Sequence, residues 1–331
     1  MGIKILGTGS YVPDFCVSND DMTKIVETND EWITTRTGIK NRHISDGQPT
    51  WWMGVQAAKK AIEDAGISPE QIGLIVDTSV THDFYTPSTA CIIQDKIGAV
   101  NATAFDINAA CAGFVFALDC ANRYMATDEN MEYALVISNE MLSRITDYED
   151  RSTCVLFGDG AAAVVLKKSD TFFTSFTHTK GEGAKYLYAK NNNPKTRFQT
   201  NIKPEYSDGF SDESTKSFLI QSGRDVYKFA TKALPEAVEK AAAKAGLDIN
   251  EIDHIIPHQA NIRIIETAAK NLKLPMEKFL VNIADHGNTS SASIPICFDE
   301  MLKAGKIKRG EKVCFVGFGA GLTYGAVIVE Y

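Results

Sequence analysis

The chain repeats part of its own pattern after an interval of about 180 residues. Residues 59–76 read KKAIEDAGISPEQIGLIV, and residues 239–256 read EKAAAKAGLDINEIDHII. Each segment predicts an alanine-rich helix that ends at a glycine, a short loop and a buried apolar strand. One repeat of this length does not indicate a solenoid but two similar halves. We therefore predict an α/β fold of two βαβ-rich halves, about 1–170 and 171–331, with mixed or mostly parallel sheets and helices on both faces.

Composition and charge narrow the class of protein. The chain has 331 residues, 44% of them hydrophobic, and its formal net charge of −8 argues against broad nucleic-acid binding. The sequence lacks a signal-peptide pattern, and no segment approaches the roughly 20 apolar residues of a membrane span. The seven cysteines are odd in number and show no CxxC spacing. These features favour a cytoplasmic protein with reduced thiols.

A polar segment interrupts the second half. Residues 181–216 are rich in Asn, Lys and Pro and predict a long surface excursion, either a lid or a plain insertion. A helix is expected to follow, from about residue 223 to 245. Pro235 is expected to kink or divide this helix, because proline removes a backbone hydrogen bond from a helix interior.

Cys111 stands among small residues in the run NAACAGF, residues 108–114. It follows a predicted strand at 104–108 and begins a predicted helix that extends to about residue 125. A helix N-terminus lowers the pKa of a thiol and favours the thiolate. A buried, inert cysteine is the ordinary alternative, but a core position would more often carry Leu or Val. The sequence therefore indicates a nucleophile with room for a carbonyl carbon, such as that of a thioester.

His258 and Asn288 follow two further predicted strands, at 252–256 and 279–283. Ligands in such folds bind beyond the ends of strands, so we expect both residues near Cys111, where the halves meet. Each can donate a hydrogen bond to a developing oxyanion. The alternatives are a helix-capping histidine and a turn asparagine. His286, beside a glycine, is the alternative base.

No cofactor or metal site is expected. The chain has no HExxH motif, and the glycine-rich run FGAGLT at 318–323 has neither the Walker lysine nor GxGxxG spacing. That run can be a turn, or its N–H groups can line an oxyanion hole.

Seven motifs in order are similar to those of the 3-oxoacyl-[acyl-carrier-protein] synthase III family, within the thiolase-like condensing enzymes. They are TNDEWI (28–33), RTG (36–38), the Cys111 segment, Arg151 with FGDGA (157–161), PHQAN (257–261), HGNT (286–289) and the 318–323 run. The resemblance covers nearly the whole chain apart from 181–216 and implies a thiolase-like fold with αβαβα layers. Elongating synthases of the superfamily use Cys-His-His, and degradative thiolases carry a second cysteine that this chain lacks.

The resemblance implies a decarboxylative Claisen condensation of an acyl-CoA starter with malonyl-acyl carrier protein. Cys111 would hold the acyl group as a thioester, and the backbone N–H groups of Cys111 and Ala320 would stabilise the oxyanion. His258 and Asn288 would stabilise the enolate that forms as carbon dioxide leaves. A neutral imidazole and a carboxamide can both donate such a hydrogen bond.

The resemblance also assigns binding residues. It implies CoA contacts at Trp32, Arg36, Thr37, Arg151 and Asn261, and a carrier-protein patch at Lys228, Arg263 and Lys270. Arginine pairs with phosphate and tryptophan can stack on adenine, whereas the ordinary alternatives are surface charges and a buried ring.

The family is dimeric, and the residue before the Pro-Ser that opens the 87–97 helix reaches the partner's acyl pocket. Here that residue is Thr86, which is smaller than the Phe of acetyl-restricted synthases. The resemblance therefore predicts a homodimer with a deeper acyl pocket, unless Phe84 or Tyr85 fills the gap. A plain surface loop at 83–86 is the alternative.

Two other functions remain open from the sequence. One is a starter-unit or acyl-transfer enzyme of specialised, polyketide-like metabolism with the same Cys-His-Asn triad. The other is a non-catalytic partner subunit that binds carrier protein, against which the intact triad argues.

Overall fold

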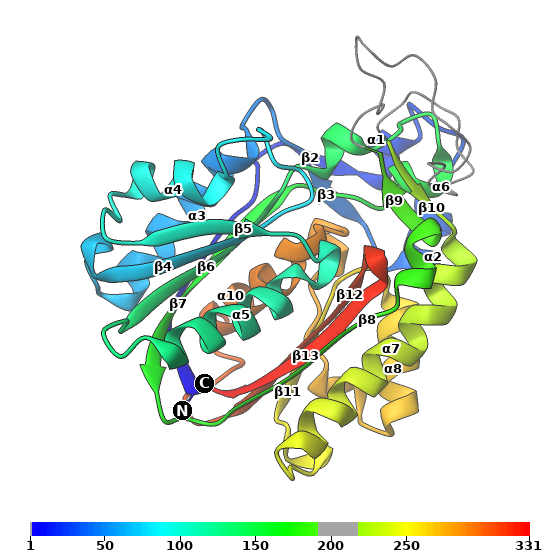
Figure 1. The fold of residues 1–331 in the computed structure, drawn as a ribbon. Coiled ribbons are helices and arrows are strands. Elements are labelled where there is room, and N and C mark those ends of the chain that lie inside the picture. Colours follow the sequence, from blue (N-terminus) through cyan, green and yellow to red (C-terminus); the bar gives the residue numbers. More distant parts are fainter. Residues whose placement is uncertain (1, 191–217) are drawn as a thin grey trace, which may run out of the picture.

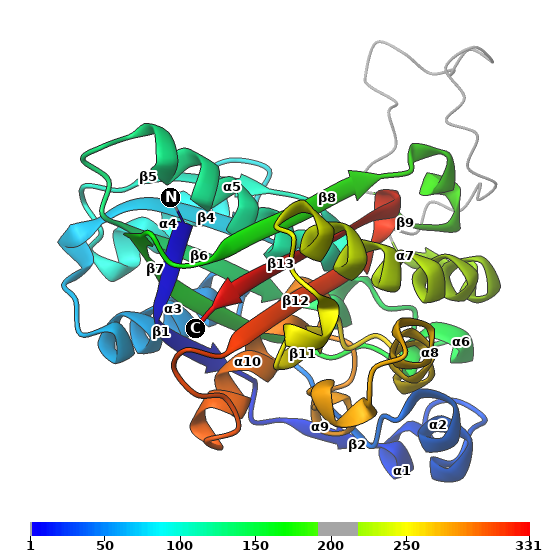
Figure 2. The same cartoon turned by 90° about the horizontal axis from the view of Figure 1, so that it is seen from below.

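The computed structural model describes residues 2–190 and 218–331 of the chain (Figure 1). Two β-sheets lie face to face with helices between them, and further helices cover their outer faces (Figures 1 and 2). The layers therefore alternate as helix, sheet, helix, sheet, helix. This is the αβαβα order of a thiolase-like fold.

The first sheet has the strand order β1-β7-β6-β4-β5. β4 is parallel to β5 and β6, whereas β7 is antiparallel to β6 and β1. Helices on both faces bury these strands, which explains the continuous apolar runs in β4 and β6. The strands are β1 (Gly2–Tyr11), β4 (Ile72–Thr78), β5 (Thr103–Ile107), β6 (Tyr133–Glu140) and β7 (Gly160–Ser169).

The second sheet has the order β11-β12-β13-β8, with β11 and β12 parallel and the other pairs antiparallel. Its strands are β8 (Phe173–Thr179), β11 (His254–Pro257), β12 (Lys312–Gly319) and β13 (Thr323–Glu330). The predicted strand at 279–283 does not form. Phe279 makes a single parallel bridge to Ile255, and the short helix α9 (Ile283–His286) begins where that strand was expected to end. This bridge occupies the place beside β11 that β5 occupies beside β4.

The two sheets thus follow one strand order, with β8 in the place of β1 and β13 in the place of β7. β7 ends at Ser169 and β8 begins at Phe173. We infer from this that the chain divides near residue 170 into the halves 1–170 and 171–331.

Helices α5 (Gly113–Thr127) and α10 (Ser293–Lys303) form the layer between the sheets (Figure 1). Phe114 of α5 and Phe298 of α10 both pack edge-on against Phe315 of β12, with ring centroids 5.5 and 4.9 Å apart. Edge-to-face aromatic pairs of this kind add about 0.5–1.5 kcal/mol each beyond the buried area. This central core fixes the strand ends from which the site residues extend.

The outer layers are α3 (Thr50–Ala65) and α4 (Thr89–Ile97) on the first sheet, and α7 (Gly223–Lys244) and α8 (Ile262–Leu272) on the second. Of the two predicted effects of Pro235, division of the helix does not occur, because α7 is continuous through this residue. The carbonyl of Thr231, which proline leaves without its usual donor, accepts a hydrogen bond from Asn271 Nδ2 of α8 at 3.0 Å. Within the described ranges, no helix combines the length and apolarity needed to cross a membrane.

Short elements complete the described chain. Residues 181–189, the start of the expected polar excursion, form a 3₁₀ helix and a strand that pairs with β10, while residues 191–216 lie outside the described residues. The short elements are β2 (Cys16–Ser18), β3 (Asn41–His43), β9 (Leu187–Ala189), β10 (Leu219–Gln221), α1 (Asn19–Met22), α2 (Asp30–Thr37) and α6 (Arg151–Cys154). The 3₁₀ turns are Pro69–Gln71, Ala110–Ala112, Leu142–Ile145, Gly181–Tyr186, Ile249–Glu251, Met276–Lys278, Ser290–Ala292 and Ala320–Leu322.

Candidate active site

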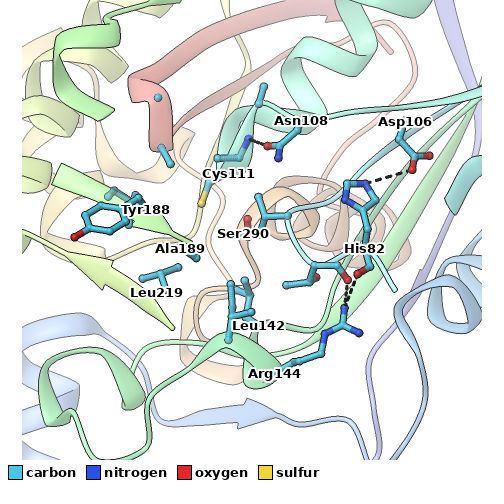
Figure 3. A pocket seen from close by; sticks show the side chains of 18 of the residues that line it. His82, Asp106, Asn108, Cys111, Leu142, Arg144, Tyr188, Ala189, Leu219 and Ser290 are labelled. Carbon is cyan, nitrogen blue, oxygen red and sulfur yellow. Dashed lines mark hydrogen bonds and ion pairs between the residues drawn. The ribbon is translucent and has the colours of Figure 1, made fainter. Parts of the chain in front are cut away.

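A cavity of about 1520 Å³ opens beside Cys111. Cys111, Thr86 and Ala320 all contribute to its wall, together with Ser290. Figure 3 shows the Cys111 sulfur pointing into this space, with Ser290 on one side and Tyr188 on the other. The cavity thus joins residues from the ends of both sheets, and its lining includes both apolar and polar groups.

Cys111 lies in the 3₁₀ turn Ala110–Ala112 between β5 and α5. The predicted helix therefore begins two residues later than expected, at Gly113. The turn packs against the end of β12: a Cβ atom on Gly319 would lie 2.5 Å from the Cys111 backbone nitrogen. Only glycine permits this approach. The loop that carries Ala320 is thereby held against the Cys111 amide, as an oxyanion hole built from both backbones requires.

The protonation state of Cys111 differs from the sequence prediction. The pKa of its thiol is raised to about 12, mainly by burial; the Ser290 hydroxyl acts in the opposite direction, and the nearby Glu140 carboxylate adds a smaller upward contribution. The cost of placing a thiolate in this enclosed position exceeds the effect expected from the helix N-terminus. Cys111 is therefore a neutral thiol at rest, and a reaction at its sulfur would require loss of the thiol proton.

A buried carboxylate near Cys111 was missed by the sequence analysis. Glu140, at the end of β6, has no exposed surface and accepts hydrogen bonds from Ser291 Oγ at 2.7 Å, Thr81 Oγ1 at 2.9 Å and Val80 N at 3.1 Å. These contacts join the end of β6 to the loop after β4 and to the turn Ser290–Ala292. The polar ending Ser-Asn-Glu of an otherwise apolar strand is the signal that could have identified it.

His258 follows β11 and is almost fully buried. Its Nδ1 lies 2.7 Å from Ser293 Oγ, the first residue of α10, and its ring packs against Phe318 with centroids 5.3 Å apart. Burial lowers the pKa of the imidazole to about 3, so the ring is neutral. Phe318 is followed by Gly319, which packs against the Cys111 turn, so these two residues connect His258 to Cys111. His258 itself does not line the cavity.

Asn288 is held by backbone contacts on both sides. Its N–H donates to Leu156 O at 2.8 Å, its carbonyl accepts from Gly158 N at 3.1 Å, and its side-chain Oδ1 accepts from Ser290 N at 2.9 Å. Because Oδ1 is engaged, Nδ2 is the side-chain atom that remains to donate a hydrogen bond. Asn288 bridges to Phe157, which lines the cavity, while Asn288 itself is buried behind it.

His286, the alternative base, faces elsewhere. Its Nε2 lies 2.6 Å from Glu300 Oε1, and its ring lies 5.4 Å from that of His43. It does not line the cavity beside Cys111. His258 does not line the cavity either, but its ring packs on Phe318, next to the Gly319 that contacts the Cys111 turn, so the geometry places His258 nearer to Cys111 through these contacts.

Two guanidinium groups lie close to the ring of Trp32. Arg36 and Arg151 are 5.0 and 4.4 Å from the centroid of its ring, although they belong to different helices, α2 and α6. Asn261, the N-cap of α8, donates from Nδ2 to the Arg36 carbonyl at 3.0 Å. Four of the five residues predicted to contact CoA therefore form one group. The fifth, Thr37, is buried and uses its hydroxyl to donate to Ile33 O at 2.6 Å.

The residues predicted to bind carrier protein are exposed on α7 and α8. Lys228 lies on α7, whereas Arg263 and Lys270 lie on α8, and a hydrogen-bond-length contact of 3.1 Å between Tyr227 and Thr267 joins the two helices there. The Arg263 Nε also donates to Thr35 O at 3.0 Å. The basic patch is thus continuous with the group around Trp32.

Thr86 is exposed and lines the cavity. Phe84 and Tyr85, which are 53% and 75% exposed, line it as well. Both aromatic side chains thus lie at the cavity within the 80–88 loop, where their movement could narrow it.

Family models and a curated relative that match this chain carry the same description. The model of 3-oxoacyl-[acyl-carrier-protein (ACP)] synthase III matches residues 105–181, and that of its C-terminal part matches residues 242–331. The chain is similar to a beta-ketoacyl-[acyl-carrier-protein] synthase III of Clostridium acetobutylicum, with 48% identity over 99% of this chain and 98% of that protein.

Solved structures show the same relationship. The crystal structure of 3-oxoacyl-[acyl-carrier-protein] synthase III from Aquifex aeolicus has a TM-score of 0.90 and 41% identity, and the match covers 100% of both chains. The priming beta-ketosynthase of the R1128 polyketide biosynthetic pathway has a TM-score of 0.89 and 33% identity, over 99% of this chain and 96% of that one.

Proposed function

The chain belongs to the 3-oxoacyl-[acyl-carrier-protein] synthase III family, and from this we propose that Cys111 is the thiol that takes an acyl group from acyl-CoA. The protein is an initiating condensing enzyme of fatty-acid synthesis and an acyltransferase. The observation that carries the residue assignment is the Cys111 sulfur in the wall of the cavity, against the glycine-rich end of β12.

In the first half-reaction, we propose that the Cys111 sulfur attacks the thioester carbonyl of acyl-CoA. A bond forms between this sulfur and the acyl carbon, the bond from that carbon to the CoA sulfur breaks, and the thiol proton leaves with the CoA thiol. The oxyanion is stabilised by the N–H groups of Cys111 and Ala320. The raised pKa of the thiol supports proton loss that is concerted with attack instead of a preformed thiolate.

In the second half-reaction, malonyl-acyl carrier protein loses carbon dioxide as its carboxylate carbon–carbon bond breaks. The electron pair moves into the thioester as an enolate, whose oxygen accepts from His258 Nε2–H and Asn288 Nδ2–H. If the Ser293 hydroxyl donates to Nδ1, it fixes the tautomer that carries the proton on Nε2. The enolate carbon then attacks the acyl-Cys111 carbonyl, and a new carbon–carbon bond forms as the bond between the acyl carbon and the Cys111 sulfur breaks. The departing thiolate takes up a proton from solvent, which restores the thiol.

We propose that CoA binds at the group around Trp32. Adenine would stack on Trp32, and phosphate would pair with Arg36 and Arg151. The ring and both guanidinium groups already lie close together in the structure. Asn261 would contact the pantetheine, and Thr37 would contribute through its backbone, because its hydroxyl is engaged. The acidic carrier protein would dock on Lys228, Arg263 and Lys270, a local basic patch on an otherwise acidic chain.

We infer that the reaction needs no cofactor, because thiol, imidazole, carboxamide and backbone groups account for each step. We also propose that the enzyme works in the cytoplasm. All seven cysteines are unpaired, as is usual in a reducing compartment.

The function is tested by incubating the protein with a panel of acyl-CoA donors and malonyl-acyl carrier protein, followed by intact-protein mass spectrometry. A 3-oxoacyl-carrier protein supports the condensing reaction. Transfer of the acyl group to a different acceptor would instead support the starter-unit alternative, for which the similarity to the priming beta-ketosynthase is the relevant observation. Binding of carrier protein without any product would support a partner subunit.

Thr86→Phe should narrow the range of acyl-CoA donors. The wild-type enzyme is expected to use butyryl-, isobutyryl- and octanoyl-CoA, because a small side chain at this position leaves the cavity open. In Thr86→Phe, kcat/KM for octanoyl-CoA should fall by at least about 10-fold while acetyl-CoA is little affected. Thr86→Val, which keeps the volume, is the control. Strict acetyl preference in the wild type would disprove this role.

We propose that the protein is a homodimer. β5 is an edge strand of the first sheet, and the loop that precedes α4 carries the exposed side chains of Phe84 and Tyr85. Unpaired edges and exposed aromatic groups favour association. Light scattering at working concentration should give twice the chain mass of 36.2 kDa, and a monomer would contradict the proposal.

A further inference from the structure

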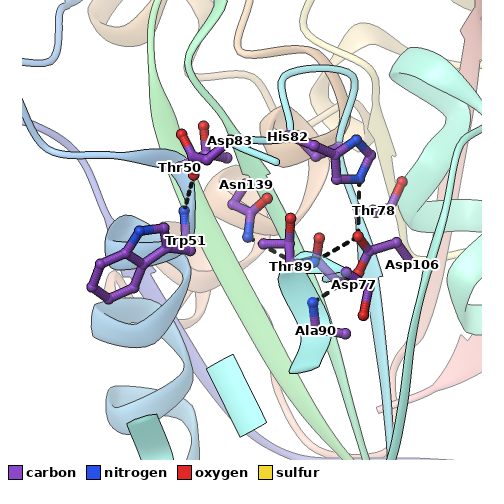
Figure 4. Close-up of polar contacts among 12 residues, drawn as sticks. Thr50, Trp51, Asp77, Thr78, His82, Asp83, Thr89, Ala90, Asp106 and Asn139 are labelled. Carbon is purple, nitrogen blue, oxygen red and sulfur yellow. Dashed lines mark hydrogen bonds and ion pairs between the residues drawn. The ribbon is translucent and has the colours of Figure 1, made fainter. Parts of the chain in front are cut away.

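Asp77, His82 and Asp106 form a compact group beside the cavity. One potential ligand atom from each lies within 4.8 Å of the other two. Asp77 on β4 and Asp106 on β5 are direct partners in the parallel register, and His82 comes from the loop that follows β4. In Figure 4 the His82 imidazole extends toward the Asp106 carboxylate, with Asp77 on the adjacent strand.

Asp77 is an unusual residue for the interior of a sheet. It has no exposed surface; one oxygen accepts a hydrogen bond from Asn139 Nδ2 at 2.8 Å, and the other has no hydrogen-bond partner among the described residues. Burial raises its pKa well above the ordinary value, and the Asp106 and Glu140 carboxylates act in the same direction. A buried acceptor without a partner beside a second carboxylate costs free energy unless a positive species compensates.

The other two members are oriented by their surroundings. Both Asp106 oxygens accept from the backbone at the start of α4, from Thr89 N at 2.7 Å and Ala90 N at 2.8 Å. Each oxygen keeps a further lone pair. His82 Nε2 is 3.4 Å from Asp106 Oδ2 and, among the described residues, has no hydrogen-bond partner. Two fixed carboxylates and an imidazole nitrogen therefore face a common point.

We propose that Asp77, His82 and Asp106 bind one divalent transition-metal cation of the zinc class. An imidazole and two carboxylates are ligands that Zn²⁺ accepts, and their two negative charges balance the cation. His82 and Asp106 line the cavity, which provides an entry path for the ion. Asn139 and the α4 amides supply the hydrogen bonds that hold the carboxylates in place, as metal ligands usually require.

The role of this ion is structural. His82 belongs to the 80–88 loop, which carries Thr86, and a bond through the metal would fasten that loop to β4 and β5. No paired-histidine motif marks the group in the sequence, because its ligands lie on two strands and a loop and meet only through the parallel register of β4 and β5.

The test uses chelator-treated full-length protein titrated with Zn²⁺ by calorimetry and with Co²⁺ by absorption. We expect one ion per chain and cobalt d–d bands without a thiolate charge-transfer band. Asp77→Asn and His82→Gln should each weaken binding by about 10- to 100-fold or more. His178→Gln, a histidine of β8, is the matched control and should bind as the wild type does.

Cys111→Ala separates this group from the catalytic thiol and should retain the ion. Because Asp77 is buried, its variant could fail to fold; His82→Gln, in a loop, keeps the test decisive. Absence of binding in the wild type, unchanged binding in His82→Gln, or loss of binding in Cys111→Ala would each overturn the proposal.

Discussion

Cys111→Ala should take up no acyl group from acyl-CoA, whereas the wild-type protein should gain the mass of one. The sulfur is the atom to which the acyl carbon becomes bonded, and alanine offers no replacement. Overall condensation should fall by several orders of magnitude, as it does when other enzymes lose a catalytic nucleophile. Intact-protein mass spectrometry measures the first effect, and product formation measures the second.

The other cysteines provide the controls. Cys16 and Cys91 are exposed, so Cys16→Ala and Cys91→Ala test for adventitious acylation and should behave as the wild type does. Iodoacetamide should label Cys111, and prior incubation with acyl-CoA should block that labelling. An acyl mass increase that persists in Cys111→Ala would exclude Cys111 as the nucleophile.

His258→Ala and Asn288→Ala should separate the two half-reactions. Both variants should still be acylated at Cys111, because neither side chain is assigned to thioester exchange. Decarboxylation of malonyl-acyl carrier protein should fall by roughly 100- to 1,000-fold in each, the usual cost of removing one donor to a developing oxyanion. Release of carbon dioxide from labelled malonyl groups is the measurement.

The pH dependence of decarboxylation adds a second readout. Burial lowers the pKa of His258 to about 3, so the neutral ring should persist as the pH falls from about 8 to about 5, where an ordinary histidine becomes protonated. The rate of decarboxylation should therefore not fall with a midpoint at the pKa of an ordinary histidine. His254→Gln, at the start of the same strand, is the matched control. Normal decarboxylation in His258→Ala would refute the assignment.

The sequence predicts the strands that precede two of the three candidate catalytic residues. Cys111 and His258 follow β5 and β11 as predicted. The apolar residues of β11 are buried, as its sequence indicates, whereas β5, at the edge of its sheet, is only partly buried. The segment that precedes Asn288 differs from the prediction. The strand predicted before it is a single bridge at Phe279 followed by a helical turn, and short apolar runs do not distinguish these conformations.

Tertiary contacts account for what the sequence could not predict. The Pro235 helix is continuous because Asn271, on another helix, satisfies the carbonyl that proline leaves free. The thiol of Cys111 is neutral because enclosure by the fold outweighs its place near a helix start. Glu140 gains its partners from loops that are remote in the chain. Local patterns carry no information about such contacts.

The close approach of Gly319 to the Cys111 amide has a consequence for the chain as a whole. Cys111, the proposed nucleophile, follows a strand of the first sheet, and the loop proposed to complete its anion-stabilising site follows a strand of the second. Neither segment forms a working centre without the other. A nascent or partly folded chain would therefore hold the thiol without its machinery, and acyl-CoA would be consumed only after the last strands had joined the structure.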